Sequence, residues 1–262
     1  MADERFAGRV AVVTGSTAEP SIGRSCAARL AREGAKVVIN GRDAERVAVA
    51  EAALRAEGLD VVGVVGSMDT EAAAELITDR AVDAFGRIDL VVSTVGGAPY
   101  ALSFDAISEA QLLETVRLNT WPTLALIRAA LARGLGGNGG GSVVTISSGS
   151  PRKTTSAMVS YASAKAALNA MTRTIAADLA GRGVRVNAVS PGLVRTSATR
   201  PIWQSDGGAA AGAALPLGRL TEAEDVAGAV CFLLSDDARQ ITGITLDVDA
   251  GNQLSSGWTP IR

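Results

Sequence analysis

Histidine is absent from all 262 residues of the chain. This absence excludes a Ser-His-Asp triad, a Cys-His nucleophile and the usual histidine-containing zinc sites. Proton transfer in any active site must therefore use Tyr, Lys, Asp, Glu or Ser, and we expect no metal site.

Cysteine and aromatic residues are scarce. The two cysteines, Cys26 and Cys231, fall in predicted helices without a metal-ligand spacing, so we expect free, buried thiols. Aromatic residues make up 3% of the chain and hydrophobic residues 47%. The core must therefore be built from Ala, Val, Leu and Ile.

Long apolar runs and basic runs are also missing. No apolar segment approaches the ~20 residues of a membrane-spanning helix, and Met1–Gly8 is too polar for a signal peptide. A net charge of −2 without a basic run argues against a nucleic-acid partner. We expect a soluble cytoplasmic protein that binds neither nucleic acid nor membrane.

What the sequence does contain is a regular alternation of short β-branched runs with helical patterns. Such an alternation predicts a parallel sheet with right-handed crossovers, hence one α/β domain over residues 1–262 with a doubly wound Rossmann fold and helices on both faces. The predicted strands are Arg9–Thr14, Lys36–Asn40, Val61–Val65, Ile88–Val95, Ser142–Ser148, Val184–Ser190 and Ile244–Val248. The predicted helices are Ser21–Glu33, Asp43–Glu57, Thr70–Phe85, Ser108–Gly134, one ending near Leu179, and Thr221–Ser235.

Three local expectations accompany this pattern. Pro122 should interrupt and kink the long fourth helix near Asn119. Thr221 should cap the last helix in a capping box with Glu224. Residues 193–215 read as an irregular substrate lid that follows a dinucleotide-binding core at 8–192.

A tyrosine and a lysine, Tyr161 and Lys165, lie one helical turn apart near the start of the fifth predicted helix. An ammonium there should lower the phenol pKa from its usual value of about 10, which would suit a general acid or base. Ser148 ends the preceding strand and could bind the same oxygen. The bare motif is also common on helices whose lysine is merely exposed.

The segment from Thr14 to Gly23 joins the first strand to the first helix, where glycines and a helix N-terminus can bind a pyrophosphate. At the end of strand two, dinucleotide folds usually carry an acidic residue for the ribose hydroxyls. Here Gly41 leaves room for a 2′-phosphate and Arg42 can pair with it, which favours NADP(H) over NAD(H). Alternatively, Arg42 is a solvated charge beside Asp43.

Taken together, these motifs resemble the short-chain dehydrogenase/reductase family, in the branch of the 3-oxoacyl-carrier-protein reductases. The resemblance runs from Gly8 to Gly251. It rests on Thr14-Gly15 and Ile22-Gly23, Asn119, Ile146-Ser147-Ser148, Tyr161 with Lys165, Asn187–Gly192 and Pro216–Arg219.

The resemblance implies roles for these residues. Tyr161 would donate a proton to a carbonyl oxygen held by Ser148, Lys165 would lower the Tyr161 pKa and bind the nicotinamide ribose, and Asn119 would hold a water or stabilise a kink. The implied cofactor contacts are Gly15, Ser16, Ser21, Ile22, Gly23, Arg42, Ser67, Met68, Val95, Gly96, Tyr161, Lys165, Pro191, Gly192, Val194 and Thr196.

The chain departs from the family pattern in three places. The phosphate turn has two inserted residues and Ser21 in place of a glycine, as in some enoyl reductases. Ser93-Thr94-Val95-Gly96 replaces the usual N-N-A-G, and Ser67 occupies the position of the acidic residue that meets adenine.

The function expected is NADPH-dependent reduction of a carbonyl, a 3-oxoacyl thioester or related ketone. The alternatives are an NAD-dependent alcohol dehydrogenase and a non-catalytic NADP-binding module. The pocket rim is expected at Pro99–Leu102, Ser150–Arg152 and Trp203, with few charges on the lid.

Two kinds of partner are implied by the same resemblance. An acyl carrier protein could dock on Arg133 and Arg182. A homotetramer could form through the apolar faces of Ala110–Ala132 and Ala164–Leu179 and through the last helix and strand.

Overall fold

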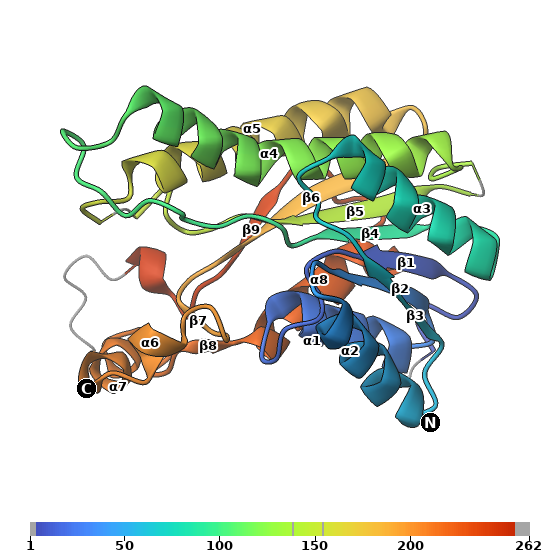
Figure 1. The fold of residues 1–262 in the computed structure, drawn as a ribbon, viewed down its shortest axis with the longest axis horizontal. Helices are drawn as coiled ribbons and strands as arrows, with labels where there is room; N and C mark the ends of the chain where they lie inside the picture. The colour runs from blue at the N-terminus through green and yellow to red at the C-terminus, as the bar shows by residue number, and fades with distance from the viewer. Residues whose placement is uncertain (1–3, 138, 154, 255–262) are drawn as a thin grey trace.

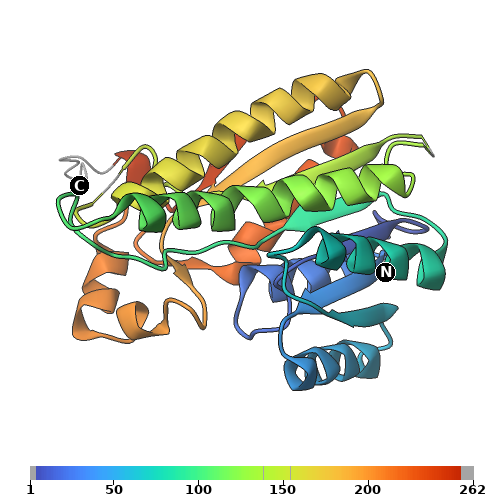
Figure 2. The same ribbon diagram turned by 45° about the horizontal axis from the view of Figure 1, so that its top comes forward.

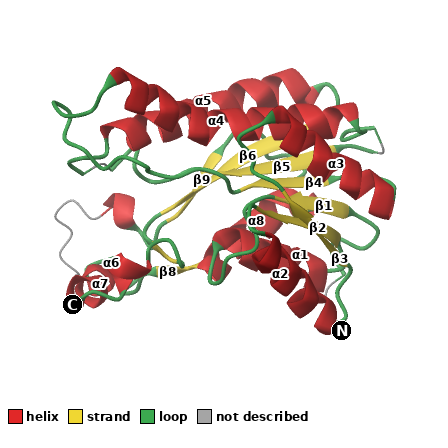
Figure 3. Cartoon of the chain, viewed as in Figure 1, coloured by secondary structure: helices red, strands yellow, loops and turns green. Residues whose placement is uncertain are grey.

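Seven parallel strands form the central sheet in the order β3-β2-β1-β4-β5-β6-β9 (Figures 1 and 3). The computed structural model describes residues 4–137, 139–153 and 155–254. The strands are β1 (Val10–Val13), β2 (Lys36–Gly41), β3 (Val61–Val65), β4 (Leu90–Ser93), β5 (Gly141–Ile146), β6 (Val184–Pro191) and β9 (Thr245–Val248). The order reverses between β1 and β4, so the predicted doubly wound, single-domain fold is confirmed.

Helices cover both faces of this sheet, with α3, α4 and α5 on one side and α1, α2 and α8 on the other (Figures 1 and 2). Their bounds are α1 (Ile22–Arg32), α2 (Ala44–Ala56), α3 (Glu71–Phe85), α4 (Glu109–Ala132), α5 (Val159–Ala180), α6 (Arg200–Trp203), α7 (Asp206–Ala213) and α8 (Ala223–Leu234), with short 3₁₀ helices η1 (Asp236–Ala238) and η2 (Asn252–Leu254). None of the helices in the described residues is long and apolar enough to span a bilayer.

The core consists of two layers separated by the sheet. Small aliphatic side chains of α1 and α8 pack on one face, and those of α3, α4 and α5 on the other. All four residues of β1 are buried, as expected for a strand covered on both faces. Cys26 and Cys231 are free and buried in the first layer, as predicted.

Local capping follows the sequence at some helices and departs from it at others. Asp43, the first residue of the helix predicted at Asp43–Glu57, caps α2 by accepting from the Arg46 N–H. The capping box of α8, however, is made by Glu222 and Asp225 rather than by Thr221 and Glu224. Thr221 instead belongs to β8 (Thr221–Glu222), which pairs with β7 (Val194–Arg195), and this pairing moves the start of the helix.

Two other expectations were wrong in detail. α4 runs unbroken through Pro122, because a proline inside a long, packed helix removes only one of many backbone hydrogen bonds. The segment 193–215 is not irregular throughout, since it contains β7, α6 and α7. Figure 1 shows these elements beside β8, beyond the carboxyl end of the sheet.

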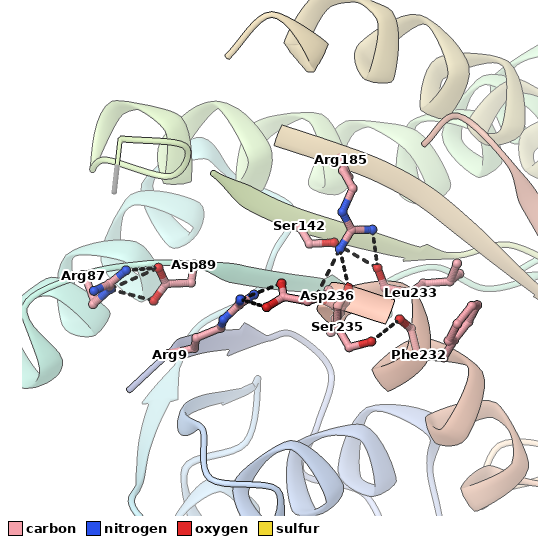
Figure 4. Close-up of polar contacts among 10 residues, drawn as sticks. Arg9, Arg87, Asp89, Ser142, Arg185, Phe232, Leu233, Ser235 and Asp236 are labelled. Atoms are coloured by element: carbon pink, nitrogen blue, oxygen red, sulfur yellow. Dashed lines mark hydrogen bonds and ion pairs between the residues drawn. The ribbon is translucent and has the colours of Figure 1, made fainter. Parts of the chain in front are cut away.

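At the opposite, amino-terminal edge of the sheet lies a cavity of about 750 Å³ lined by arginines. Figure 4 shows three of them, Arg9, Arg87 and Arg185, whose charges are used within the fold. Arg185 donates to the carbonyls of Leu233, Leu234 and Ser235 at the end of α8, at 2.6–3.2 Å. Arg9 pairs with Asp236, and Arg87 with Asp89. We therefore assign this cavity a structural role. The candidate active site lies at the carboxyl edge of the sheet.

Candidate active site

The predicted site residues come from four elements that meet at the carboxyl edge of the sheet. Ser148 lies two residues beyond β5, Tyr161 and Lys165 lie on the first turns of α5, and Asn119 lies within α4. Gly96 follows β4. In a parallel sheet the carboxyl ends of neighbouring strands share one edge, and this edge is where open α/β sheets bind ligands.

Tyr161 is largely shielded from water, and the pKa of its phenol is raised. Burial raises the pKa of the Tyr161 phenol, and a hydrogen bond from the Ser148 hydroxyl lowers it by a smaller amount. The net shift is upward, so the expectation that Lys165 lowers this pKa is wrong for the protein without cofactor. The physical reason is that desolvation disfavours the phenolate.

Lys165 is almost fully buried, with 4% of its surface exposed. Its ammonium donates to the Ile146 carbonyl at 2.9 Å and lies 5.7 Å from the centre of the Tyr161 ring. Burial lowers the pKa of Lys165 to about 8. The amine therefore stays mostly protonated at neutral pH and loses its charge only as the pH rises above about 8.

Asn119 fixes the loop after β4. Its amide group donates to the carbonyls of Gly97 and Thr115, both at 2.8 Å, and its oxygen accepts from the Gly97 N–H at 3.0 Å. Gly96 has a φ of +139°, and a Cβ there would collide with Asn119 Oδ1. Glycine is therefore needed for the loop to approach Asn119 and Lys165 this closely.

The turn after β1 is built by close backbone approach. Gly15 has a φ of +59°, and a Cβ on Gly23 would collide with the Gly15 carbonyl. Ser21, which replaces the family's glycine, caps α1: its hydroxyl accepts from the Arg24 N–H at 3.2 Å and donates to the Ala18 carbonyl at 2.7 Å. The inserted residues thus end in a capped helix N-terminus, and Ile22 begins that helix.

Ser16 faces the protein interior. It is fully buried, and its hydroxyl donates to the Val13 carbonyl at 2.8 Å and accepts from the Asn40 N–H at 3.0 Å. Its N–H donates to the Asn40 carbonyl at 2.9 Å, so both its hydroxyl and its N–H are engaged within the fold.

A second cavity, of about 720 Å³, extends from this turn across the ends of β2, β3 and β4. Its lining includes seven residues predicted from sequence, namely Gly15, Gly41, Arg42, Ser67, Met68, Val95 and Gly96. Arg42 and Arg46 are exposed, and neither guanidinium has a hydrogen bond or ion pair within the described residues. The cavity therefore offers two free cations next to a glycine-lined backbone.

Sequence reasoning missed Thr17, Asn40 and Arg46 in this lining. The position of Arg46, one helical turn after Arg42, could have revealed it. Thr17 could not be found in this way, because it is brought to Gly41 only by the tertiary structure. A Cβ on Gly41 would collide with the Thr17 side chain, so the glycine makes room for Thr17 rather than directly for a phosphate.

The residues replacing N-N-A-G brace the sheet by other means. The Ser93 hydroxyl lies 2.8 Å from that of Thr123 on α4. The Thr94 N–H donates to the Thr14 hydroxyl at 3.2 Å, and the Thr94 hydroxyl donates to the Thr14 carbonyl. Ser67, at the position of the missing adenine contact, donates to Asp69 at 2.7 Å.

The segment after β6 lies against the phosphate turn. Pro191 ends β6, Gly192 packs against Asp249, and Val194 begins β7. Thr196 is buried, and its carbonyl accepts from the indole N–H of Trp203 at 2.9 Å.

The next residue reaches the inserted part of the phosphate turn. The Ser197 N–H donates to the Pro20 carbonyl at 2.8 Å. Across the segment, the Arg195 guanidinium lies 5.8 Å from the Trp203 ring and pairs with Glu222 at 3.2 Å.

The two arginines expected to dock a carrier protein differ in their surroundings. Arg133 forms a two-pronged ion pair with Asp79, with an Nη2–Oδ2 distance of 2.9 Å. Arg182 is exposed. Because Arg133 is already neutralised, only Arg182 keeps an available charge.

A dinucleotide fits this edge better than a metal does. Gly15, Gly23 and Gly96 allow a close backbone approach that a side chain would block, and Gly15, Gly96, Arg42 and Arg46 line the same cavity. The capped N-terminus of α1 follows this glycine turn, and such a terminus can bind a phosphate. No cluster of three or more His, Cys, Asp or Glu residues able to hold a metal occurs among residues 4–137, 139–153 and 155–254.

Comparisons with known proteins support the same assignment. Residues 15–253 match the family described as enoyl-(acyl carrier protein) reductase. The chain is 37% identical over 247 residues to human dehydrogenase/reductase SDR family member 4, covering 94% of this chain and 88% of the relative. It is 35% identical over 256 residues to the Thauera aromatica (2S)-[(R)-hydroxy(phenyl)methyl]succinyl-CoA dehydrogenase subunit BbsD, covering 95% and 98% of the two chains.

The fold is likewise that of solved enzymes. A 7α-hydroxysteroid dehydrogenase complexed with NADH and 7-oxo glycochenodeoxycholic acid superimposes with a TM-score of 0.88 at 28% identity, over 95% of this chain and 96% of that one.

Proposed function

The chain belongs to the short-chain dehydrogenase/reductase family of NAD(P)-dependent oxidoreductases, and from this premise we propose that it reduces a ketone or 3-oxoacyl thioester with NADPH. The observation that carries the proposal is the meeting of Ser148, Tyr161 and Lys165 at the carboxyl edge of the sheet, beside a cavity with two free arginines. The bound nicotinamide would supply the hydride.

In this proposal Tyr161 acts as the general acid. Its raised pKa keeps the phenol protonated at neutral pH, which is the form needed to donate to an oxygen that gains negative charge. Ser148 holds that oxygen by a hydrogen bond. Lys165 lies one turn after Tyr161 on α5 and would bind the ribose, and Asn119 holds the loop after β4.

The direction of the reaction follows from the same pKa. Oxidation of an alcohol needs the phenolate as a base, and burial disfavours the phenolate. Near neutral pH the unliganded site therefore holds the protonated phenol that reduction needs. Oxidation with NAD⁺ is the second candidate, because one relative is a dehydrogenase by name and the 7α-hydroxysteroid dehydrogenase was solved with NADH.

The substrate would lie under residues 193–215, which we propose as the lid. Of the three charged residues in this segment, Arg195 pairs with Glu222 and lies over the ring of Trp203, whereas Arg200 and Asp206 are exposed. A lid with so few charges favours an uncharged carbonyl. A carrier-bound thioester would have to use Arg182 without Arg133.

Preference for NADPH is the part of the proposal that a binding experiment tests directly. Arg42 and Arg46 would pair with the 2′-phosphate, and each charge-assisted contact contributes about 1.5–3 kcal/mol. Arg42→Ala should therefore weaken NADPH binding about tenfold to a hundredfold and leave NADH nearly unchanged. High salt should reduce the ratio of NADPH affinity to NADH affinity, because the exposed arginines are screened by ions.

Fluorescence titration with both cofactors measures this effect. Arg55→Ala is the matched control, since Arg55 lies in the last turn of α2, the helix that begins two residues after Arg42, and pairs with Glu51. If Arg42→Ala lost the same factor of affinity for NADPH and for NADH, the charge argument would be contradicted. Reversal of preference requires Gly41→Asp together with Thr17→Ala, because the aspartate would otherwise collide with Thr17.

A panel of ketones, 3-oxoacyl thioesters, 2-enoyl thioesters and the corresponding alcohols then tests the reaction. Reduction of carbonyls with NADPH is the expected result. Turnover of the enoyl compounds alone would assign the chain to enoyl reduction, and cofactor binding without any turnover would make it a non-catalytic module.

A further inference from the structure

Two hydrogen bonds reach the Ser148 hydroxyl from a neighbour two residues further along the chain. The Ser150 N–H donates to Ser148 Oγ at 3.1 Å, and the two hydroxyl oxygens lie 2.9 Å apart. A serine hydroxyl has one proton to donate and two lone pairs with which to accept. If Ser150 fills both lone pairs, the Ser148 proton is directed elsewhere, and Tyr161 is its hydrogen-bonding neighbour.

The turn that carries these groups is held from several sides. The Gly149 N–H donates to the Pro191 carbonyl at 3.0 Å. The Gly149 carbonyl accepts from the Arg152 N–H at 3.0 Å and from the Gln253 side chain at 3.3 Å. Because both peptide groups of Gly149 are anchored, the Ser150 N–H is fixed in its direction towards Ser148.

We propose that Ser150 is a positioning residue that occupies the acceptor sites of Ser148 and so commits the Ser148 proton to the oxygen on which Tyr161 acts. The effect on turnover rests on the proposed carbonyl reduction, whereas the effect on Tyr161 requires no turnover. Without the Ser150 hydroxyl, the Ser148 hydroxyl can rotate among its staggered positions and spends less time as a donor to Tyr161.

The protonation of Tyr161 provides the direct test. Only two tyrosines occur in the chain, so 3-fluorotyrosine incorporated in a Tyr100→Phe background reports Tyr161 alone by ¹⁹F NMR. Fluorine also lowers the intrinsic phenol pKa, which brings the titration into milder conditions. Circular dichroism at each pH verifies that the fold is retained.

Three substitutions in this background separate the outcomes. Ser150→Ala should raise the Tyr161 pKa by up to about one unit, and Ser148→Ala by at least as much. Ser150→Thr keeps both the hydroxyl and the N–H and should remain near the parent value. An unchanged or lower pKa in Ser150→Ala would overturn the proposal, since a lower value means that Ser148 donates to Ser150 instead.

Kinetics in the otherwise unmodified protein supply the second readout. Ser150→Ala should lower kcat about twofold to tenfold with little change in KM, as for one neutral hydrogen bond, and Ser150→Thr should restore it. If the Tyr161 pKa rises in Ser150→Ala but the protein reduces no carbonyl, the proposed function is wrong and the proposed role of Ser150 stands. If the protein reduces carbonyls, and Ser150→Ala changes neither kcat nor the Tyr161 pKa, only the proposed role of Ser150 is wrong.

Discussion

Burial sets the charge of single residues at the centre of this site. Lys165 has lost nearly all contact with water, and Tyr161 is largely shielded. The loss of hydration lowers the pKa of the amine and raises that of the phenol, so both side chains shift towards their neutral forms. A neutral phenol near pH 7 is suited to give a proton away.

Removal of the Tyr161 hydroxyl tests its role as the acid. Tyr161→Phe keeps the ring and its packing, so the rate of carbonyl reduction should fall by about 10²–10⁴ while NADPH still binds. Steady-state kinetics and cofactor titration measure both quantities. Ser163→Ala, an exposed position on the same helix, is the control. Near-complete turnover in Tyr161→Phe would show that another group supplies the proton.

The buried amine of Lys165 makes a prediction for stability that needs no substrate. Its pKa falls from about 10.5 to about 8 on folding, so the unfolded chain binds the proton more tightly between these values. The contribution of Lys165 to stability therefore rises with pH through this window, and below about pH 8 the full burial penalty is present.

Urea unfolding of wild type and Lys165→Met should reveal this penalty. The free energy of unfolding of the wild type should increase relative to the variant by about 2–4 kcal/mol between about pH 7 and about pH 10, since ~1.4 kcal/mol corresponds to one pKa unit. All other ionisable groups are common to both proteins. Parallel pH profiles would mean that the amine is hydrated in the folded state.

At the scale of elements, the inserted phosphate turn connects two parts of the site. Ser21 begins α1 with a side-chain cap, and the Pro20 carbonyl accepts a hydrogen bond from Ser197, just after β7. The insertion thus lengthens the turn without leaving it unsupported. It also gives the proposed lid a direct backbone contact with the turn expected to bind pyrophosphate.

The end of α8 depends on one arginine. Arg185 on β6 donates to the carbonyls of Leu233, Leu234 and Ser235 at the end of α8 (Figure 4), where the last carbonyls lack partners within the helix. It also donates to the Ile241 carbonyl. Arg185→Leu should lower the free energy of unfolding by about 2–4 kcal/mol, because it removes several charge-assisted hydrogen bonds at once. Urea unfolding without cofactor measures the loss.

A nearby arginine gives the matched control for this change. Arg182→Leu alters an exposed side chain three residues earlier and should shift the free energy by no more than about 0.5 kcal/mol. Equal effects of the two substitutions would mean that the hydrogen bonds at the end of α8 do not stabilise the fold.

For the whole molecule, exposed apolar side chains indicate surfaces that another copy could cover. Leu113 on α4 and Val159 on α5 are 59% and 41% exposed, and Phe232 on α8 and Ile244 before β9 are 37% and 39% exposed. Leu113, Phe232 and Ile244 fall in segments through which a homotetramer is predicted to form, and Val159 lies just before the predicted segment Ala164–Leu179. Burying such patches is the usual reason for symmetric assembly.

Light scattering tests the homotetramer directly. The wild type should give the mass of four chains at micromolar concentration, and Phe232→Asp should reduce it to two, because a buried charge breaks the contact through α8 and β9. Val49→Asp, on the outer face of α2 and 63% exposed, should leave the mass unchanged. A monomeric wild type would rule out the tetramer.

Much of the fold was predictable because its signals are local in sequence. The β-branched runs placed the strands, and the predicted starts at Asp43 and Ser108 coincide with the residues that cap α2 and α4. The cap of α8 was not predictable, because the pairing of β7 with β8 uses residues far apart in the chain.

The sequence by itself determined the alternation that makes the sheet parallel, and the carboxyl edge of such a sheet then brings Ser148, Tyr161 and Lys165 together. Only the tertiary structure decided the upward shift of the Tyr161 pKa, the packing of Thr17 on Gly41, and the two hydrogen bonds of Ser150 to Ser148. The physical reason is that periodicity and spacing are properties of neighbouring residues, whereas desolvation and close contact depend on what the rest of the chain packs around them.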